Sequence, residues 1–507
     1  MKMMRVVVLV IVGLFGLRSG VGATEYYVSL GGNDVNNGGS GAPFRTFKKA
    51  NSVLVGGDVL YVTAGVYNES LIIDRSGTSG KTIKVRALNT DKPVIDVRAN
   101  SGSSIWIRGN YIDLTGFKAT NSTSMGVRIN GSNVVVDNVE VYNIPDHGIF
   151  TTGKYVTVRN SVVHDSMTAN EPTWDVVKNK WVYPLSGGWG SGFKVERGAE
   201  NVVFENNVSY HNYGEGIATT MGKNIIFRNN YSHDNYSVNI YVDHSDTVLV
   251  ERNMVTCSPN DTKYFRDGHP AAGVLMGEED YSGWTAPLAN VTIVNNISYG
   301  CRGFNFYGAE VASGGLRKAL IANNTIWNTF GGSYAINIAN EPANNNIRIV
   351  NNIVDGRINA GSGSVVTNNI NQAQFVGAPS ASPGSFKLAA GSSAINKGVV
   401  ISEVVYDFGG SIRDNLPDIG AWEYGSVGGP SIIPTSVIPT TVVTVTTTPS
   451  QKLLGDANSD GRVDLVDFTI WKSEYLRTLS TKRADFNKSG GVDLVDFSIW
   501  KKAYLLN

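Results

Sequence analysis

Charged and phenolic side chains recur at matching points of three neighbouring segments, 190–197, 214–220 and 239–244. Each segment contains a short alternating run, so that every second side chain would share one face of a strand. The candidates for catalysis in these runs are Lys194, Glu196, Glu215, Tyr241 and Asp243. A lysine of lowered pKa can abstract a proton, a tyrosine can protonate a leaving oxygen, and two carboxylates can hydrolyse a glycosidic bond. The patch therefore predicts acid–base chemistry.

Two reaction classes compete for this patch, and a third hypothesis needs no reaction. In β-elimination from a uronic-acid glycan, Lys194 would be the base and Tyr241 the acid. In glycoside hydrolysis, Glu196 and Asp243 would act as a carboxylate pair about 9.6 Å apart by strand spacing, with Glu215 between them in height. Alternatively, the patch only binds a glycan. We favour elimination and keep hydrolysis and binding open.

The elements that must position these residues are copies of a short repeat. The runs at 133–138, 201–206 and 224–229 are β-branched and end in Asn, and the last two start 23 residues apart. A period in the low twenties indicates a solenoid. Three short strands per turn, bent at Asn and Gly, predict an all-β fold, a right-handed parallel β-helix, rather than a β-sandwich. Asn pairs such as Asn206-Asn207 recur at one point of the repeat and predict a stacked ladder.

Two insertions interrupt the repeat, at 167–190 and 257–283. Insertions in solenoids form loops on one face, which is often the binding face. Their aromatic side chains are candidate platforms for sugar rings: Trp174, Trp181, Tyr183, Trp189, Tyr264, Tyr281 and Trp284. Cys257 and Cys301 fall at similar points of adjacent repeats, and both a disulfide and two buried thiols remain open.

Composition and the segments between the repeats predict an exported protein that contains several domains. Residues 1–23 have the charged start, apolar run and small-residue cleavage site of a signal peptide. The β-helix is expected over 24–425, a Pro/Thr-rich linker over 426–450 and a second module over 451–507. The 43 basic and 43 acidic residues balance, so nothing indicates nucleic acid or a membrane as a partner. We expect an extracellular protein that acts on or binds a polysaccharide.

The second module contains a duplicated loop of oxygen donors followed by an aromatic helical face. The spacing matches positions 1, 3, 5, 7, 9 and 12 of an EF-hand loop, with Asp at the last position. The first loop offers Asp456, Asn458, Asp460, the Arg462 carbonyl, Asp464 and Asp467, and the second offers Asp485, Asn487, Ser489, the Gly491 carbonyl, Asp493 and Asp496. Two Ca²⁺ ions are therefore predicted.

These two loop-helix halves resemble a dockerin of type I-like character, the module that attaches secreted enzymes to cohesin-bearing scaffold proteins. The resemblance covers 453–506. It implies a cohesin-bearing scaffold as partner. It also implies that Leu465-Val466 and Leu494-Val495, the same dipeptide in both halves, contact that partner in two equivalent orientations.

The first coil and the polar patch resemble secreted β-helix polysaccharide lyases. Residues 25–67 resemble the first coil of such proteins, with a capping helix at 44–55. The stretch from Ser191 to Lys194, followed by Glu215-Gly216-Ile217, is similar to a signature of β-helix pectate lyases with a lysine base. Here the lysine sits two positions earlier and the calcium-holding acidic cluster is reduced to Glu215. A catalytic-domain Ca²⁺, a metal-free lyase, an epimerase and a hydrolase all remain open.

Overall fold

The computed structural model describes residues 23–98, 102–184, 188–281, 284, 286–310, 314–332, 334–426, 457, 463, 465–476, 483–487 and 491–504. The chain divides into two compact units, Met1–Ile438 and Pro439–Asn507. The predicted signal peptide, except its last residue, and the predicted linker, except its first, lie outside the described residues. Among the described residues, no helix is long and apolar enough to cross a membrane.

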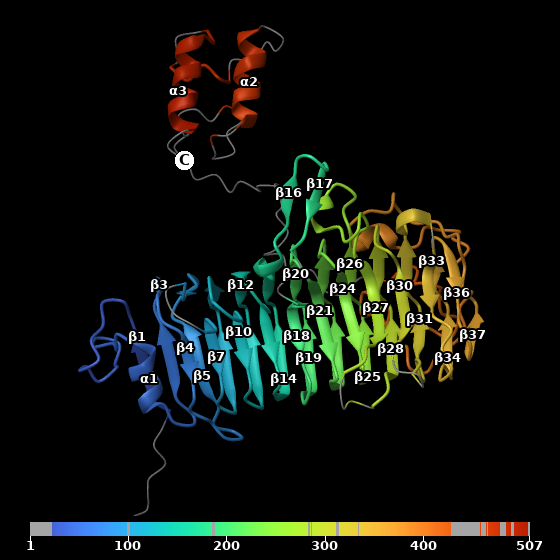
Figure 1. Ribbon diagram of the computed structural model, residues 1–507, viewed down its shortest axis with the longest axis horizontal. Helices are drawn as coiled ribbons and strands as arrows, with labels where there is room; N and C mark the ends of the chain where they lie inside the picture. Colours follow the sequence, from blue (N-terminus) through green and yellow to red (C-terminus); the bar gives the residue numbers. More distant parts are fainter. Residues whose placement is uncertain are drawn as a thin grey trace, which may run out of the picture. The chain divides into compact units, whose positions relative to one another are not determined.

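The first unit is a parallel β-helix in which three sheets run along the solenoid, as the repeat predicted (Figure 1). The first sheet contains β1 (Glu25–Val28), β2 (Val59–Val62), β5 (Ile83–Ala87), β8 (Ile112–Thr115), β11 (Val134–Asp137), β14 (Lys154–Arg159), β19 (Glu200–Glu205), β22 (Lys223–Arg228), β25 (Asp246–Glu251), β28 (Ala289–Val294), β31 (Leu320–Ala322), β34 (Ile347–Val350) and β37 (Ser364–Thr367). The second sheet contains β4 (Leu71–Ile73), β7 (Ile105–Ile107), β10 (Val127–Ile129), β13 (Ile149–Thr151), β18 (Ser191–Val195), β21 (Glu215–Thr220), β24 (Val238–Asp243), β27 (Ala272–Glu278), β30 (Phe304–Ala309), β33 (Tyr334–Ile338) and β36 (Arg357–Asn359).

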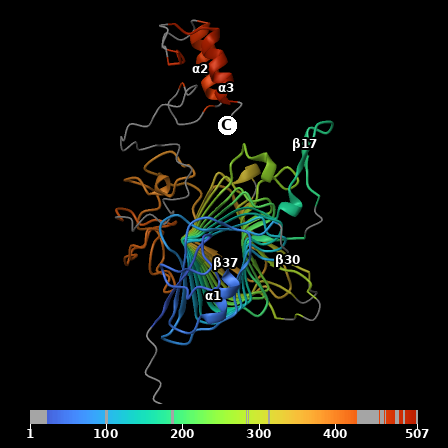
Figure 2. The same ribbon diagram turned by 90° about the vertical axis from the view of Figure 1, so that its left-hand side faces the viewer.

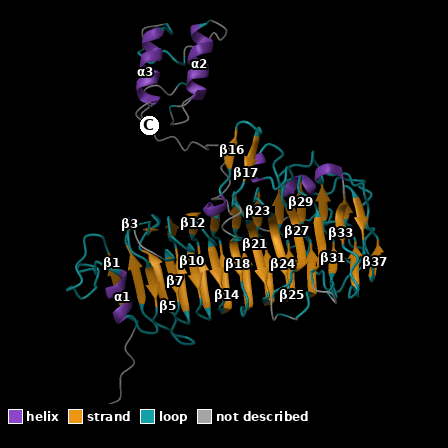
Figure 3. Ribbon diagram, viewed as in Figure 1, coloured by secondary structure: helices purple, strands orange, loops and turns teal. Residues whose placement is uncertain are grey.

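The third sheet contains β3 (Val66–Tyr67), β6 (Val94–Asp96), β9 (Lys118–Thr120), β12 (Glu140–Ile144), β15 (Val162–Ser166), β20 (Val208–Tyr210), β23 (Tyr231–His233), β26 (Met254–Thr256), β29 (Ile297–Tyr299), β32 (Thr325–Trp327) and β35 (Ile353–Val354). Outside these sheets, β16 (Thr173–Asp175) and β17 (Lys180–Val182) form an antiparallel hairpin that projects from the solenoid (Figure 3). Short 3₁₀ turns occur at Thr168–Asn170, Thr262–Tyr264, Phe330–Gly332 and Pro383–Phe386.

Paired asparagines explain where the coils bend and what holds the bends together. The first Asn of a pair, such as Asn206 or Asn229, adopts a positive φ of 55° or 54°. Asn tolerates this left-handed conformation better than most residues. The second Asn is buried and donates its amide to the next coil, in a ladder that runs from Asn207 to Asn369. The successive Nδ2–Oδ1 distances are 3.1, 3.0, 3.0, 3.0, 3.0 and 2.8 Å.

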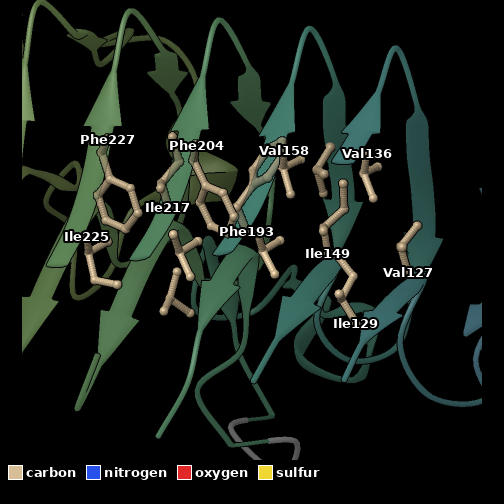
Figure 4. Packing of buried hydrophobic residues seen from close by; sticks show 14 of the residues in the cluster. Val127, Ile129, Val136, Ile149, Val158, Phe193, Phe204, Ile217, Ile225 and Phe227 are labelled. Carbon is tan, nitrogen blue, oxygen red and sulfur yellow. The ribbon is translucent and has the colours of Figure 1, made fainter. Parts of the chain in front are cut away.

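The interior of the solenoid is filled by the alternate, inward-pointing residues of the strands (Figure 4). Phe204 and Phe227 stack at a ring-centroid distance of 5.5 Å, and Phe193 packs against Phe204 at 5.8 Å. Fully burying one such side chain contributes about 1.5–3 kcal/mol. Because inward and outward positions alternate, this core fixes which residues of each strand face solvent.

The ends and one side of the solenoid are covered by non-repetitive segments. Helix α1 (Phe47–Val53) covers the N-terminal coil shown in Figure 2, and Thr46 caps it by accepting from the Lys49 N–H. The predicted helix is therefore confirmed but shorter than 44–55. The closing segment packs Phe386, Phe408 and Trp422 against Met254 and Ile297 of the third sheet.

In the second unit, α2 (Leu465–Tyr475) and α3 (Leu494–Tyr504) pack through the aromatic faces that the sequence predicted. Phe468 lies 5.0 Å from Trp500 between ring centroids, and Trp471 lies 4.8 Å from Phe497. These rings form the hydrophobic core of the domain, and the domain is too small to bury a large core.

Candidate active site

A cleft of about 940 Å³ opens over the outer face of the second sheet, between β18 and β30. Its lining includes His147, Lys194, Glu196, Glu215, Tyr241, Glu279 and Arg302. Four of the five predicted candidates for catalysis therefore face one space, and the fifth, Asp243, is not part of the lining. A volume of this size accommodates several sugar rings rather than a single small ion.

Parallel pairing stacks the candidates into columns. Lys194 pairs with Ala218, and Ala218 pairs with Tyr241, so that Lys194 and Tyr241 lie two strands apart in one column. In the next outward column, Thr220 pairs with Asp243. The third column, at the strand entrances, contains Ser191 opposite Glu215.

Lys194 lies in a nearly enclosed polar environment. Its Nζ donates to the Thr220 hydroxyl at 2.7 Å and lies 3.9 Å from Glu215 Oε2. Both charged side chains are only 7% exposed. Burial raises the pKa of Glu215, while the Lys194 charge and the Ser191 hydroxyl, which donates to Glu215 at 2.6 Å, oppose this shift. A buried carboxyl of raised pKa can hold a proton beside the amine.

His147 lies next to Ser191 and Lys194, and its imidazole ring is neutral. Burial, and then the Lys194 charge, lower the pKa of His147 to about 3. Its Nδ1 accepts a hydrogen bond from the Ser191 N–H at 2.9 Å. At neutral pH the other ring nitrogen is therefore the one that carries the proton.

Glu279 gathers three tyrosine hydroxyls at the opposite side of the cleft. Its Oε1 accepts from Tyr241 at 2.7 Å and from Tyr307 at 3.1 Å, and its Oε2 accepts from Tyr281 at 2.9 Å. Burial raises the pKa of Tyr241, with nearby carboxylates adding to the shift, so this phenol keeps its proton. Sequence reasoning did not identify Glu279, because it follows β27 inside the non-repetitive insertion. The acidic run Glu278-Glu279-Asp280 is the signal that was available.

Asp243 lies beneath the segment that carries Glu279. The residue is fully buried, and its Oδ1 accepts from the Glu279 N–H at 3.3 Å. Its Oδ2 has no well-aligned hydrogen-bond donor among the described residues. Burial raises the pKa of Asp243 to about 7, against the lowering effect of the nearby Tyr281 hydroxyl. Because Glu196 lines the cleft and Asp243 does not, the two carboxylates do not face a common space.

Three arginines bring positive charge to the cleft wall. Arg197 stacks on Trp284 at 5.2 Å, and Arg266 stacks on Trp189 at 4.4 Å. The third, Arg302, also lines the cleft, and its buried Nε has no hydrogen-bond acceptor among the described residues. Guanidinium groups bind planar carboxylates well, so the wall suits an acidic glycan.

The insertion aromatics divide between the cleft and their own loops. Trp189 and Tyr281 line the cleft. Trp174 and Trp181 pack edge-to-face on the β16–β17 hairpin, and Tyr183 stacks on Tyr236 at 3.9 Å. Tyr264 is buried against His211 and Tyr213. Only part of the aromatic set is thus placed to stack on a bound sugar.

Cys257 and Cys301 form a disulfide with a Cα–Cα distance of 5.0 Å, which settles the alternative that the sequence left open. The bond joins adjacent coils at the point where the second insertion begins. It lies directly before Arg302, whose backbone N–H also donates to the Ala271 carbonyl at 3.1 Å.

Metal-ligand groups of the described residues lie outside the cleft. Around Lys194 the acidic residue within 4 Å is Glu215 alone. The one His/Asp group of metal-binding spacing among the described residues is His211, Asp234 and Asp261, on the side of the third sheet.

The second unit has donors that fit calcium. Asp496 is fully buried, accepts from the Phe486 N–H at 2.8 Å and the Asp493 N–H at 2.9 Å, and so is held inside its own loop. With Asp485, Asn487 and the Gly491 carbonyl, these are the hard oxygen donors that Ca²⁺ prefers. In the first loop, Asp467 is buried and accepts from the Ala457 N–H at 2.8 Å. The remaining predicted ligands, Asp456, Asn458, Asp460, Arg462, Asp464 and Ser489, lie outside the described residues.

Comparison with family models divides the chain in the same way. Residues 26–179 match the Pel9A-like right-handed β-helix region, and residues 184–261 match a general right-handed β-helix region. Residues 454–505 match the dockerin type I domain.

Comparison with individual proteins gives three similarities, of which the first supports the fold. Among solved structures, pectate lyase Pel9A is similar with a TM-score of 0.51 at 17% identity, over 80% of this chain and 97% of that chain. A rhamnogalacturonan lyase matches over 80% of this chain and 96% of its own, at 16% identity and a TM-score of 0.43. The uncharacterized protein YwoF of Bacillus subtilis is 37% identical over 75 residues, which is 15% of this chain. The match spans 16% of that relative's length.

Proposed function

We propose that this chain, a right-handed parallel β-helix protein with a C-terminal dockerin type I domain, is a secreted polysaccharide lyase that cleaves a uronic-acid glycan by β-elimination. The observation that carries the proposal is the placement of Lys194 and Tyr241 across one cleft whose wall carries arginines. The similarity to pectate lyase Pel9A in fold is consistent with it.

In this reaction the base removes the proton at C5 of the uronate, the C4–O bond breaks, and a C4–C5 double bond forms. Lys194 would accept the C5 proton in its neutral form. The Glu215 carboxylate, whose Oε2 lies 3.9 Å from Nζ, would stabilise the ammonium that forms when Lys194 takes the C5 proton. Thr220 orients Nζ through its 2.7 Å hydrogen bond.

Tyr241 would give its hydroxyl proton to the leaving oxygen. Its proton is directed at Glu279 in the free protein, and Tyr307 lies 3.2 Å away to take over that contact. The substrate carboxylate must be neutralised for the C5 proton to become acidic, and Arg266, which lines the cleft and donates to the Ser237 hydroxyl at 3.3 Å, would supply positive charge for this.

The dockerin domain would attach the lyase to a cohesin-bearing partner outside the cell. Asp485, Asn487, Gly491, Asp493 and Asp496 would hold one Ca²⁺ and fix the loop. In α3, Leu494 and Val495 are 59% and 54% exposed, as expected of side chains that contact a partner.

The test is to incubate the full chain with pectate, alginate and neutral glycans and to follow two products. Elimination gives an unsaturated uronate that absorbs at about 235 nm. New reducing ends without this absorbance would indicate hydrolysis and overturn the proposal. Retained binding without either product would leave a glycan-binding solenoid.

A further inference from the structure

We propose that the Arg302 end of the cleft is a second carboxylate subsite, which binds a uronate of the same glycan chain at a distance from the reacting one. The inference deepens the proposed action on a uronic-acid glycan and rests on it. Arg302 would select substrates that are long enough and acidic, and it would take no part in bond cleavage.

Arg302 lies far from Lys194 along the solenoid. Register places it opposite Ala272, which pairs with Val238, which in turn pairs with Glu215. It therefore precedes β30, whereas Lys194 lies on β18, four strands away. Four strand spacings amount to about 19 Å, more than one sugar ring can span.

The positive charge of Arg302 is only weakly compensated by the described part of the chain. No acidic side chain forms an ion pair with it among the described residues, and its buried Nε has no acceptor. Burial and the neighbouring Arg266 cation lower the pKa of Arg302, and Asp267 opposes them. A partly buried guanidinium without a partner is costly, and a bound carboxylate would remove that cost.

The backbone on both sides of Arg302 is fixed. Cys301 is joined to Cys257, and Gly303 has a φ of +72°. A Cβ at Gly303 would lie 2.4 Å from the Ala335 carbonyl oxygen, so the glycine is required there. The Arg302 carbonyl accepts from the Asn305 amide at 2.8 Å. The constrained backbone therefore holds the start of the Arg302 side chain in one place at the wall of the cleft.

The Arg302 side chain also lines a smaller hollow next to the cleft. This hollow has a volume of about 260 Å³ and is lined by Arg302, Asn305, Tyr307, Tyr334 and Asn337, with Leu275 at its border. Leu275, Arg302 and Tyr307 also line the main cleft, so the hollow continues the cleft along the sheet. Amide and phenol groups around one guanidinium are suited to an acidic sugar ring.

The experiment compares Arg302→Ala and Arg302→Lys with the full chain that retains Arg302, by calorimetric binding. The probes are octasaccharides and disaccharides of polygalacturonate and of alginate, and the same octasaccharides after reduction of their carboxyl groups. To prevent turnover, every protein also carries Lys194→Ala. Arg348→Ala is the charge-matched control, because Arg348 pairs with Glu403 on the first sheet at 2.9 Å, outside the cleft.

For the octasaccharide that binds best, we expect Arg302→Ala to weaken binding by about ten- to a hundred-fold, with Arg302→Lys in between. Arg348→Ala should bind the octasaccharide as tightly as the protein with both arginines. The disaccharides and the carboxyl-reduced chains should bind equally well with and without Arg302. Unchanged octasaccharide affinity in Arg302→Ala overturns the subsite. So does an equal loss with the carboxyl-reduced chain, or a failure of all the acidic octasaccharides to bind the protein with Arg302 intact. Binding that depends on Arg302, together with no unsaturated product from the chain that retains Lys194, would instead overturn the proposed reaction and leave the subsite standing.

Discussion

Lys194 and Tyr241 lie in one outward column of the second sheet, and only Ala218 stands between them. The Ala218 methyl is fully buried and packs in one cluster with Tyr241 and Val238. Two strand spacings separate the lysine and tyrosine backbones by about 9.6 Å. Because Lys194 and Tyr241 both line the cleft, a sugar ring bound there would meet an amine and a phenol.

Removing the phenol should slow the reaction without disturbing the fold. Tyr241→Phe deletes the hydroxyl that contacts Glu279 at 2.7 Å, and we expect kcat to fall by about a hundred- to ten-thousand-fold. Glu279→Gln keeps an acceptor for the tyrosines and should cost less. Unsaturated product formed per second is the measurement. The control is Tyr142→Phe, on the third sheet, and equal activity of Tyr241→Phe and Tyr142→Phe would contradict the role.

Asp243 should make stability depend on pH. Its folded pKa is about 7, above the ordinary value of 3.8, so the folded protein holds this proton more tightly than the unfolded chain. The contribution is complete below pH 3.8 and is lost as pH rises to about 7. Over this window it changes stability by about 1.4 kcal/mol per pH unit.

Asp243→Asn keeps the shape and removes the titration. Denaturant unfolding at several pH values should therefore show a smaller fall of stability between pH 4 and 7 in the variant than in the wild type. Parallel curves for the two proteins would show that Asp243 does not titrate in this range.

The asparagine ladder should be one of the least tolerant parts of the solenoid. Asn253 donates to the Phe227 carbonyl at 2.8 Å and to Asn296 at 3.0 Å, and accepts from Asn230. Asn253→Ala leaves these buried groups without partners, at a cost of about 3–5 kcal/mol in unfolding free energy. Asn37→Ala, which removes an exposed turn contact to Gly39, should cost less than about 1 kcal/mol. Equal effects of the two substitutions on unfolding would argue against a structural ladder.

Removing calcium should affect the dockerin domain alone. A chelator should reduce the helical circular dichroism of the full chain and abolish binding to a cohesin, and added Ca²⁺ should restore both. Asp496→Ala should weaken the response of the second loop, since Asp496 organises that loop through the Phe486 and Asp493 N–H groups. Lyase activity should stay unchanged, and its loss on chelation would instead indicate a metal in the cleft.

The regular spacing of the repeats determined how much of the fold and of the candidate site could be predicted from the sequence. The shared column of Lys194 and Tyr241 follows from alternation within a strand and from the 23-residue spacing of the repeats. Glu279 could not be placed, because its segment departs from the repeat and reaches the cleft only after folding over Asp243. The same segment explains why the predicted Glu196 and Asp243 do not meet. His244 anchors it by contacts to the Glu279 and Ala286 carbonyls, which no sequence pattern indicates.

The aromatic residues of the two insertions show the same limit of prediction from sequence. Trp189 and Tyr281 reach the cleft, whereas Tyr264 is buried in a stack with His211 at a centroid distance of 4.4 Å. Composition identifies an insertion rich in rings, but the packing of each ring depends on tertiary contacts between insertions. The disulfide was likewise one of two alternatives until the coils were placed.

The most direct test of the account is proton NMR of the products formed from an acidic oligosaccharide by wild type and by Lys194→Ala. The account predicts an olefinic H4 signal and loss of the H5 signal at the new non-reducing end with wild type. With Lys194→Ala, it predicts intact substrate that is still bound. Saturated products that keep H5, or unsaturated product formed at an undiminished rate by Lys194→Ala, would contradict the assignment of Lys194 as the base.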